Sequence, residues 1–321
     1  MTTQLVADIG GTNARFALHD PQSRTLDRGR TLTAAEYPDI VAAIRAYLEA
    51  AGSPGIVEAC FAVAAPVKED QIDFTNSPWR FSRSDLARRL RIERLLTVND
   101  FEALALGVPH IPQSGLHQLR DGQIEPAAPK AIIGPGTGLG VSGLIPCRHR
   151  DGSAHWTALS GEGGHVSFAP VNELEAELLR FLSRKFDRVS NERLLCGEGL
   201  SNLYEFFAAR AGSPDQRLLP AEITARGLDR SDPAAHDALQ MFCNVLGSAA
   251  GDLALTLGAQ GGVYIGGGIV PRLLRVLADS DFTRRFLAKG RMGKVLIPIP
   301  IYVIVDATAA LLGAAAALQE N

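Results

Sequence analysis

The chain has 321 residues, of which 46% are hydrophobic and 21% charged, enough for two domains with cores of their own. A net charge of −3 argues against a general nucleic-acid-binding surface, and no apolar run is long enough to span a bilayer. The first residues enter a strand without a basic and apolar leader, and the four cysteines form no CxxC pair. We therefore expect a cytoplasmic protein with reduced thiols that binds neither nucleic acid nor a membrane.

The first predicted element is a hairpin of two short strands, residues 5–9 and 15–18. Its turn region comprises Asp8, Ile9, Gly10, Gly11, Thr12 and Asn13. Successive N–H groups at the two glycines can form a nest for phosphate oxygens, and Asp8 could hold the water shell of a Mg²⁺ ion that a phosphate chain shares. An ordinary glycine turn with a capping aspartate explains the same residues, so this turn alone leaves both interpretations open.

The rest of the first half alternates strands with helices, which predicts an α/β core. Apolar patterning predicts strands over residues 25–32, 56–65 and 94–98, and helices over residues 37–51, 84–90 and 101–107. The last of these strands carries Asn99 and Asp100 to its carboxyl end, where α/β sheets bind ligands. Asn99 suits a polyol, and Asp100 could accept a proton from an attacking hydroxyl in phosphoryl transfer. Capping of the following helix is the alternative role for Asp100.

The second half opens with another glycine-rich hairpin over residues 131–144, after a proline-rich crossing over residues 108–129. Its turn, Gly136-Thr137-Gly138, aligns with Gly11-Thr12 of the first. A formal GxGxxG lies here, but the chain continues as a strand until Pro146 ends it, which excludes a dinucleotide fingerprint. Two α/β halves that each begin with a phosphate-type hairpin predict two facing domains and a cleft that grips one polyphosphate from both sides.

Three later segments carry polar side chains or glycines of interest. Glu162 and His165 lie in a flexible loop, where hydrogen bonding to adjacent hydroxyls fits better than zinc because no second His or Cys lies at ligand spacing. Glu192 offers a further carboxylate, with helix capping as its alternative role. The run Gly266, Gly267 and Gly268 could let the backbone approach an adenine face, or it could be a helix-entry turn.

The remaining elements of the second half are mostly helical. Helices are predicted over residues 174–186, 200–211, 233–257 and 271–277, and a strand over residues 262–265. An extended segment over residues 295–305 then leads to a closing helix over residues 307–319 with Asp306 at its N-cap.

With these residues in view, the chain resembles the bacterial glucokinase family of the hexokinase/actin-like ATPase superfamily over essentially its full length. Residues 8–13 and 134–138 resemble the two phosphate loops of that family, and residues 261–271 its adenosine segment. Residues 99–101, 161–168 and 190–192 resemble its glucose-binding segments. The resemblance implies a two-domain, ribonuclease H-like α/β fold with a ligand cleft between the domains.

The same resemblance implies ATP-dependent phosphorylation of the 6-hydroxyl of D-glucose, giving glucose 6-phosphate and ADP. Asp100 would be the general base, and Asn99, Glu162, His165 and Glu192 would hold the other hydroxyls. Residues 10–13 and 136–138 would flank the phosphates of ATP, with Asp8 near Mg²⁺. Related repressor-type kinases carry a zinc-binding cysteine cluster after their Glu-x-Gly-His segment; this chain has none, which implies the zinc-free branch.

Two alanine- and glycine-rich helices, residues 103–107 and 309–315, resemble the paired helices that connect the domains in this family; plain core packing would explain them equally well. If they are hinges, residues 1–110 and 301–321 form a small discontinuous domain and residues 111–300 a large one. The resemblance also implies a homodimer. Two alternatives remain: a kinase of another hexose (mannose, fructose or an amino sugar), or an actin-like ATPase without a metabolic substrate.

Overall fold

The chain begins with an antiparallel hairpin of two largely buried apolar strands, β1 (Thr3–Ile9) and β2 (Asn13–Asp20). The computed structural model describes residues 3–67, 69–74, 79–148, 152, 154–213 and 216–320. By its internal packing the chain divides into two units. Unit 1 comprises Met1–Gly115, Leu144–Ser160 and Asp306–Asn321, and unit 2 comprises Leu116–Gly143 and Gly161–Val305.

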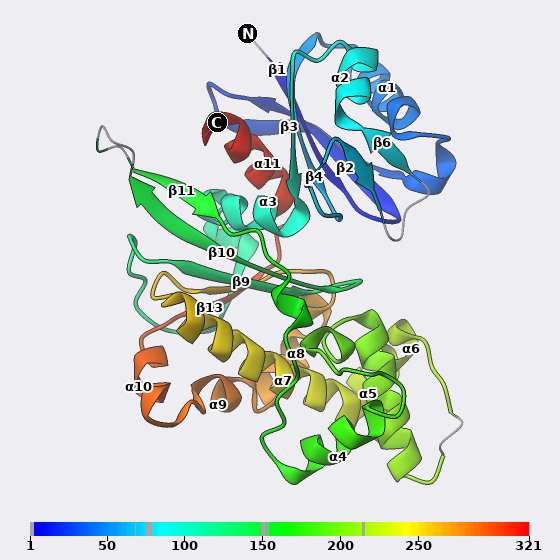
Figure 1. Ribbon diagram of the computed structural model, residues 1–321, viewed down its shortest axis with the longest axis vertical. Coiled ribbons are helices and arrows are strands. Elements are labelled where there is room, and N and C mark those ends of the chain that lie inside the picture. The colour runs from blue at the N-terminus through cyan, green and yellow to red at the C-terminus, as the bar shows by residue number, and fades with distance from the viewer. Residues whose placement is uncertain are drawn as a thin grey trace. The chain divides into compact units, whose positions relative to one another are not determined.

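The sheet of unit 1 has the strand order β3-β2-β1-β4-β7, completed by β3 (Thr25–Thr33), β4 (Ile56–Val63) and β7 (Arg94–Asn99). Strands β1, β4 and β7 are parallel, so their carboxyl ends share one edge. Helices α1 (Ile40–Ala50) and α2 (Arg83–Leu90) lie on one face, and α3 (Asp100–Gly107) and α11 (Ala309–Glu320) on the other (Figure 1). A small hairpin, β5 (Gln71–Asp73) and β6 (Arg80–Ser82), precedes α2.

Glycines allow α3 and α11 to pack backbone against backbone. A Cβ atom at Gly107 would lie 2.1 Å from the carbonyl oxygen of Ala309, and one at Gly313 would lie 1.6 Å from that of Ala103. Both distances are far inside van der Waals contact, so only glycine fits at either position. The two helices therefore form one tightly packed pair within unit 1.

The second sheet has the order β11-β10-β9-β12-β13-β8. Its strands are β8 (Leu116–Arg120), β9 (Lys130–Pro135), β10 (Leu139–Arg148), β11 (Ala154–Ala158), β12 (Val263–Ile265) and β13 (Ile301–Ile304). Strand β12 runs parallel to both β9 and β13. Strand β9 is buried along its whole length, as expected for a strand in the interior of a sheet that is covered on both faces.

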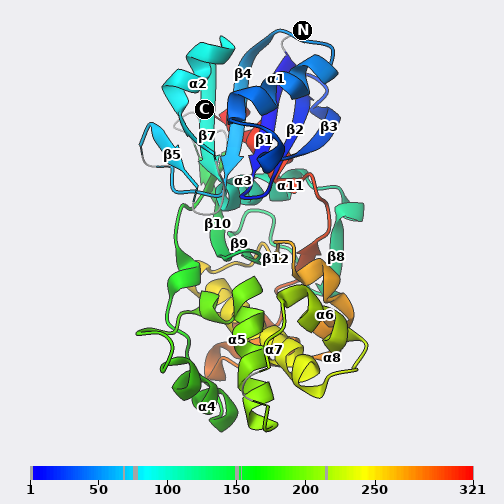
Figure 2. The ribbon, with the colours of Figure 1, turned by 90° about the vertical axis from the view of Figure 1, so that its right-hand side faces the viewer.

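The helices of unit 2 build its core against this sheet. They are α4 (Glu173–Leu182), α5 (Gly197–Arg210), α6 (Pro220–Leu228), α7 (Pro233–Leu257), α8 (Leu274–Asp279), α9 (Phe282–Leu287) and α10 (Gly293–Leu296). Figure 2 shows α5, α6 and α7 lying together in unit 2. Among the described helices, α7 is long and apolar enough to cross a membrane, but 67% of its most apolar window is buried in the protein. Its apolar character is thus that of a core helix.

Most elements predicted from the sequence are present, and the helix of residues 101–107 begins one residue earlier, at Asp100. The continuation of the second hairpin as a strand is confirmed by β10, which supports the exclusion of a dinucleotide fingerprint. The prediction that Pro146 ends this strand is wrong, because β10 continues to Arg148 and Pro146 pairs with Trp156 of β11. Proline is compatible with a strand where the ladder needs no donor from its nitrogen.

Three further expectations need correction. The loose crossing over residues 108–129 contains β8, a short strand that pairs with β13 and whose polar side chains conceal its pattern. The extended segment over residues 295–305 is extended only from Ile301, because Leu296 is fully buried and ends the short helix α10, which packs on α7. The last helix begins at Ala309 rather than Ala307, so the prediction that Asp306 is its N-cap is wrong; Oδ1 of Asp306 accepts a hydrogen bond of 2.7 Å from the amide of Thr308, the residue before the helix.

Candidate active site

The carboxyl edge of the unit 1 sheet gathers the first set of predicted site residues. Ile9 of β1 is in register with Val63 of β4, and Val63 with Asn99 of β7. Strands in a sheet lie about 4.8 Å apart, so the hairpin turn after β1 and the start of α3 after β7 lie about 10 Å apart, with one strand between them. The predicted phosphate loop and the predicted general base therefore face the same edge.

The turn of the first hairpin is closed by its own backbone. The Gly10 amide donates to the Asn13 carbonyl at 3.0 Å, and the Thr12 carbonyl accepts from the Ala34 amide at 2.8 Å. Thr12 and Asn13 are exposed. The turn thus has a held backbone with exposed polar side chains, which suits an oxygen-rich ligand.

Asp8 is ion-paired within the hairpin. Its Oδ2 lies 2.9 Å from Nη1 of Arg15, the residue directly opposite it in the β1–β2 register. Burial raises the pKa of Asp8 above its ordinary value, and the Arg15 guanidinium opposes that rise. Arg15 therefore helps to keep this carboxylate charged, as a role near a cation would require.

Replacing Arg15 with methionine should lower the free energy of unfolding by about 1–3 kcal/mol at neutral pH, because a mostly buried carboxylate loses its partner. The folded-state pKa of Asp8 is already above its unfolded value, so deprotonation costs stability as the pH rises through that pKa. Without Arg15 this pKa rises further, so the deficit should shrink as the pH falls. Urea unfolding at several pH values measures this difference, with Arg30→Met on the exposed strand β3 as the control. A deficit that stayed constant with pH would contradict the pairing.

Asn99 and Asp100 begin α3 and share its capping. Asn99 is the N-cap: its Oδ1 accepts from the Phe101 amide at 2.9 Å, and the Glu102 carboxylate accepts from the Asn99 amide at 3.0 Å. Oδ1 of Asp100 also accepts from the Phe101 amide, at 3.0 Å. Asn99 and Asp100 therefore both accept hydrogen bonds from the first turn of α3, as the capping alternative predicts. In this capping role, Oδ1 of Asp100 accepts the hydrogen bond from the Phe101 amide.

The carboxyl edge of β9 and β12 gathers the second set, in unit 2. Ile133 is in register with Ile265, so the Gly136 turn and the Gly266–Gly268 run follow neighbouring parallel strands. The Gly266 amide donates to the Ile133 carbonyl at 2.8 Å. Gly267 has φ +80°, and a Cβ atom there would lie 2.2 Å from the Pro135 carbonyl oxygen, so only glycine allows this approach. The phosphate-type turn and the predicted adenosine segment are thus packed together.

The loop of residues 163–168 is tied to the segment that carries Glu192. The Asn191 amide donates to the Val166 carbonyl at 2.9 Å, and Nη1 of Arg188 donates to the His165 carbonyl at 2.7 Å. These bonds place Nδ1 of His165 3.8 Å from Oε1 of Glu192. Glu162 and His165 are exposed, as ligand-binding side chains need to be.

The structure thus gathers the predicted residues in two groups, one in each unit. Unit 1 holds Asp8, Ile9, Gly10, Gly11, Thr12, Asn13, Asn99 and Asp100, and unit 2 holds Gly136, Thr137, Gly138, Glu162, His165, Glu192, Gly266, Gly267 and Gly268. Among the described residues, no group of three or more His, Cys, Asp or Glu side chains could hold a metal ion. Sequence reasoning missed Arg15 and Arg188; the hairpin register, which sets Arg15 opposite Asp8, is a signal that could have found the first.

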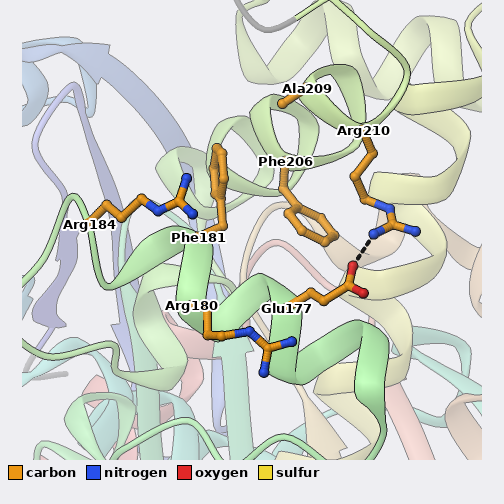
Figure 3. A pocket seen from close by; sticks show the side chains of 7 residues that line it. All are labelled: Glu177, Arg180, Phe181, Arg184, Phe206, Ala209 and Arg210. Atoms are coloured by element: carbon orange, nitrogen blue, oxygen red, sulfur yellow. Dashed lines mark hydrogen bonds and ion pairs between the residues drawn. The ribbon is translucent and has the colours of Figure 1, made fainter.

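A surface cavity of about 330 Å³ lies elsewhere in unit 2, lined by residues of α4 and α5 and by Arg184 (Figure 3). Its apolar wall consists of Phe181 and Phe206. Two of its three arginines are ion-paired, Arg180 to Glu173 and Arg210 to Glu177. Most of its positive charge is therefore neutralised within the unit, and none of the predicted site residues lines it.

Comparison with known proteins finds relatives that are described as glucokinases. A family model described as glucokinase matches residues 5–321. A glucokinase from Chromobacterium violaceum is 48% identical over 318 residues, covering 99% of this chain and 90% of the relative. The crystal structure of a glucokinase from an Antarctic psychrotroph matches with a TM-score of 0.89 and 37% identity, covering 100% of both chains. A ROK family glucokinase from Streptomyces griseus, solved with glucose and AMPPNP, matches with a TM-score of 0.67 at 20% identity and covers 99% of this chain and 100% of its own.

Proposed function

The chain belongs to the glucokinase family, and we propose that it phosphorylates glucose at the 6-hydroxyl with Asp100 as the general base. In this proposal, ATP is held between the two glycine hairpins. The chain is a hexose kinase with the two-domain actin-like ATPase fold of glucokinases and ROK sugar kinases. The observation that carries the assignment of residues is the shared carboxyl edge of β1, β4 and β7, which sets Asp100 at the same edge as the Asp8 hairpin with one strand between them.

Asp100 is the general base in this proposal. One of its oxygens is held by the Phe101 amide, which orients the carboxylate at the start of α3. The 6-hydroxyl of the sugar would give its proton to Asp100 as its oxygen attacks the γ-phosphorus in line. Asn99, Glu162, His165 and Glu192 would hold the other hydroxyls. Such bonds would orient the sugar, and a hexose that left these polar groups unpaired would bind more weakly.

ATP would lie against glycine backbones of both units. Residues 10–13 and 136–138 would flank the β- and γ-phosphates, and residues 266–268 would lie against the adenosine. The ROK family glucokinase with glucose and AMPPNP, a nucleotide analogue, supports this pair of ligands. The proposal keeps two domains, with residues 1–110 and 301–321 as the small domain and residues 111–300 as the large one. Closure on glucose would keep water from the γ-phosphoryl group.

Mg²⁺ fits the residues present, and its role would be to neutralise charge on the phosphates. Mg²⁺ keeps several waters and binds through one or two carboxylates together with substrate phosphates. The edge of the unit 1 sheet offers Asp8, kept charged by Arg15, which suits contact through a water molecule. The proposal includes no zinc; metal analysis of the purified protein, without chelators, tests this point.

The proposal extends to the state of the protein in the cell. We expect a cytoplasmic homodimer that binds neither nucleic acid nor a membrane, as the resemblance and the composition indicate. Size-exclusion chromatography with light scattering measures the oligomeric state, and a mass equal to one chain would contradict the dimer.

A panel of hexoses tests the function. With ATP and Mg²⁺, glucose should give the highest kcat/KM among glucose, mannose, fructose and glucosamine, because the proposal assigns the hydroxyls of glucose to Glu162, His165, Glu192 and Asn99. ADP formation measured in a coupled assay follows each reaction. A higher kcat/KM for another hexose would reassign the substrate, and ATP turnover that no hexose stimulates would contradict the kinase assignment.

A further inference from the structure

Glu192 connects two parts of unit 2 that the proposed function assigns to different ligands. Its Oε1 lies 3.8 Å from His165, on the side assigned to the sugar. Its Oε2 accepts a hydrogen bond of 2.9 Å from the amide of Leu139, the first residue of β10. Leu139 directly follows Gly138, so this bond ends on the glycine turn assigned to the phosphates.

The glycine turn is shaped to admit this carboxylate. A Cβ atom at Gly138 would lie 2.6 Å from Oε2 of Glu192, so any side chain there would displace it. Gly138 also closes the turn, because its carbonyl accepts from the Gly136 amide at 2.8 Å. The Gly136 carbonyl in turn accepts from the Gly197 amide at 3.0 Å, at the start of α5. One short segment, residues 192–197, therefore holds the turn at two points.

We propose that Glu192 is a positioning residue for the phosphate turn and that it couples sugar binding to nucleotide binding. This inference rests on the proposed function. A sugar hydroxyl bound to one carboxylate oxygen restricts the side-chain torsions of Glu192. The other oxygen then holds the Leu139 amide more firmly, and the backbone of the Gly136–Gly138 turn is held with it. Coupling of this kind is reciprocal: bound nucleotide should tighten glucose binding by the same factor.

Two substitutions of Glu192 separate positioning from sugar contact. Glu192→Gln keeps an oxygen that can accept from the Leu139 amide, whereas Glu192→Leu has similar size and no acceptor. Titration calorimetry of the full chain with AMPPNP and Mg²⁺, first without sugar, measures the nucleotide Kd. We expect the leucine variant to bind about tenfold more weakly than the parent and the glutamine variant to stay close to it. Adding saturating glucose should tighten nucleotide binding in the parent and leave the leucine variant unchanged.

His165→Ala is the matched control, because the His165 side chain lies near Oε1 of Glu192, on the sugar side, and not on the bond that joins Oε2 of Glu192 to the turn. It should weaken glucose binding and leave the sugar-free nucleotide Kd unchanged. Hydrogen exchange gives a direct readout: the Leu139 amide should exchange faster in Glu192→Leu than in the parent or in His165→Ala.

Gly138→Ala provides a second route if the leucine variant does not fold, since its methyl group would displace the same carboxylate. It should weaken sugar-free nucleotide binding as Glu192→Leu does, and the double variant should be no weaker than either single one. The inference would be overturned if the Glu192→Leu variant bound AMPPNP with the same Kd as the parent and if its Leu139 amide exchanged at the same rate as in the parent. Failure of the proposed function would appear differently, as a parent protein that forms no ADP in response to glucose.

Discussion

Replacing Asp100 with asparagine lowers kcat for glucose by about 10²–10⁴-fold, the range over which a positioned general base contributes to catalysis. Asparagine keeps the size of the side chain and an oxygen that can accept from the Phe101 amide, so the start of α3 should stay intact. What it loses is the ability to take the proton of the attacking hydroxyl. Steady-state kinetics with varied glucose and ATP measure the loss, which should fall on kcat rather than on the KM for ATP.

Asp85→Asn is the matched control for this experiment. Asp85 also lies in the first turn of a helix of unit 1, α2, but it is ion-paired to Arg88 on the surface. Its replacement should leave kcat unchanged. Near-parent kcat in Asp100→Asn would show that Asp100 is a capping residue only, and AMPPNP binding confirms that each variant is folded.

Replacing Gly313 with alanine lowers the free energy of unfolding by about 3 kcal/mol, the upper part of the usual range for overpacking. The added Cβ would lie 1.6 Å from the Ala103 carbonyl oxygen and would force α3 and α11 apart. The sign of the change in the free energy of unfolding is informative, because replacing glycine with alanine within a helix otherwise stabilises a protein by about 0.5–1 kcal/mol. Urea unfolding measures the change.

Gly29→Ala on strand β3 is the control, since a Cβ atom there meets no other atom within 4 Å. It should change stability little. A Gly313→Ala variant as stable as the parent, or more stable, would mean that the two helices do not pack as closely as their glycines indicate. Because α3 starts at Asp100, any shift of this pair should also reduce kcat.

The local sequence pattern was sufficient to predict the strands and turns that carry the candidate site residues. The two glycine turns between apolar strands, and the Asn99-Asp100 pair after a strand, were found because strand periodicity and turn residues act over a few positions. The predictions for Pro146 and for residues 116–120 are wrong because strand pairing outweighs the local pattern there. Pro146 lies in β10 because that strand pairs with the next one, β11, where Trp156 is its partner. The short polar strand β8 is stabilised by β13, a partner far along the chain.

The sequence by itself determined the two phosphate-type hairpins, the candidate base Asp100, and the resemblance that the family comparison confirms. Only the tertiary structure decided which of these residues lie at the same edge of a sheet and which atoms form hydrogen bonds with them. Asp8 and Asp100 lie at the same edge of the sheet because β1, β4 and β7 are parallel and in register. Glu192 reaches the Leu139 amide from 53 residues away. Such contacts depend on the packing of distant segments, which no local pattern records. The physical reason is that hydrogen bonds and close packing act between atoms in space, whereas residue type and spacing act along the chain.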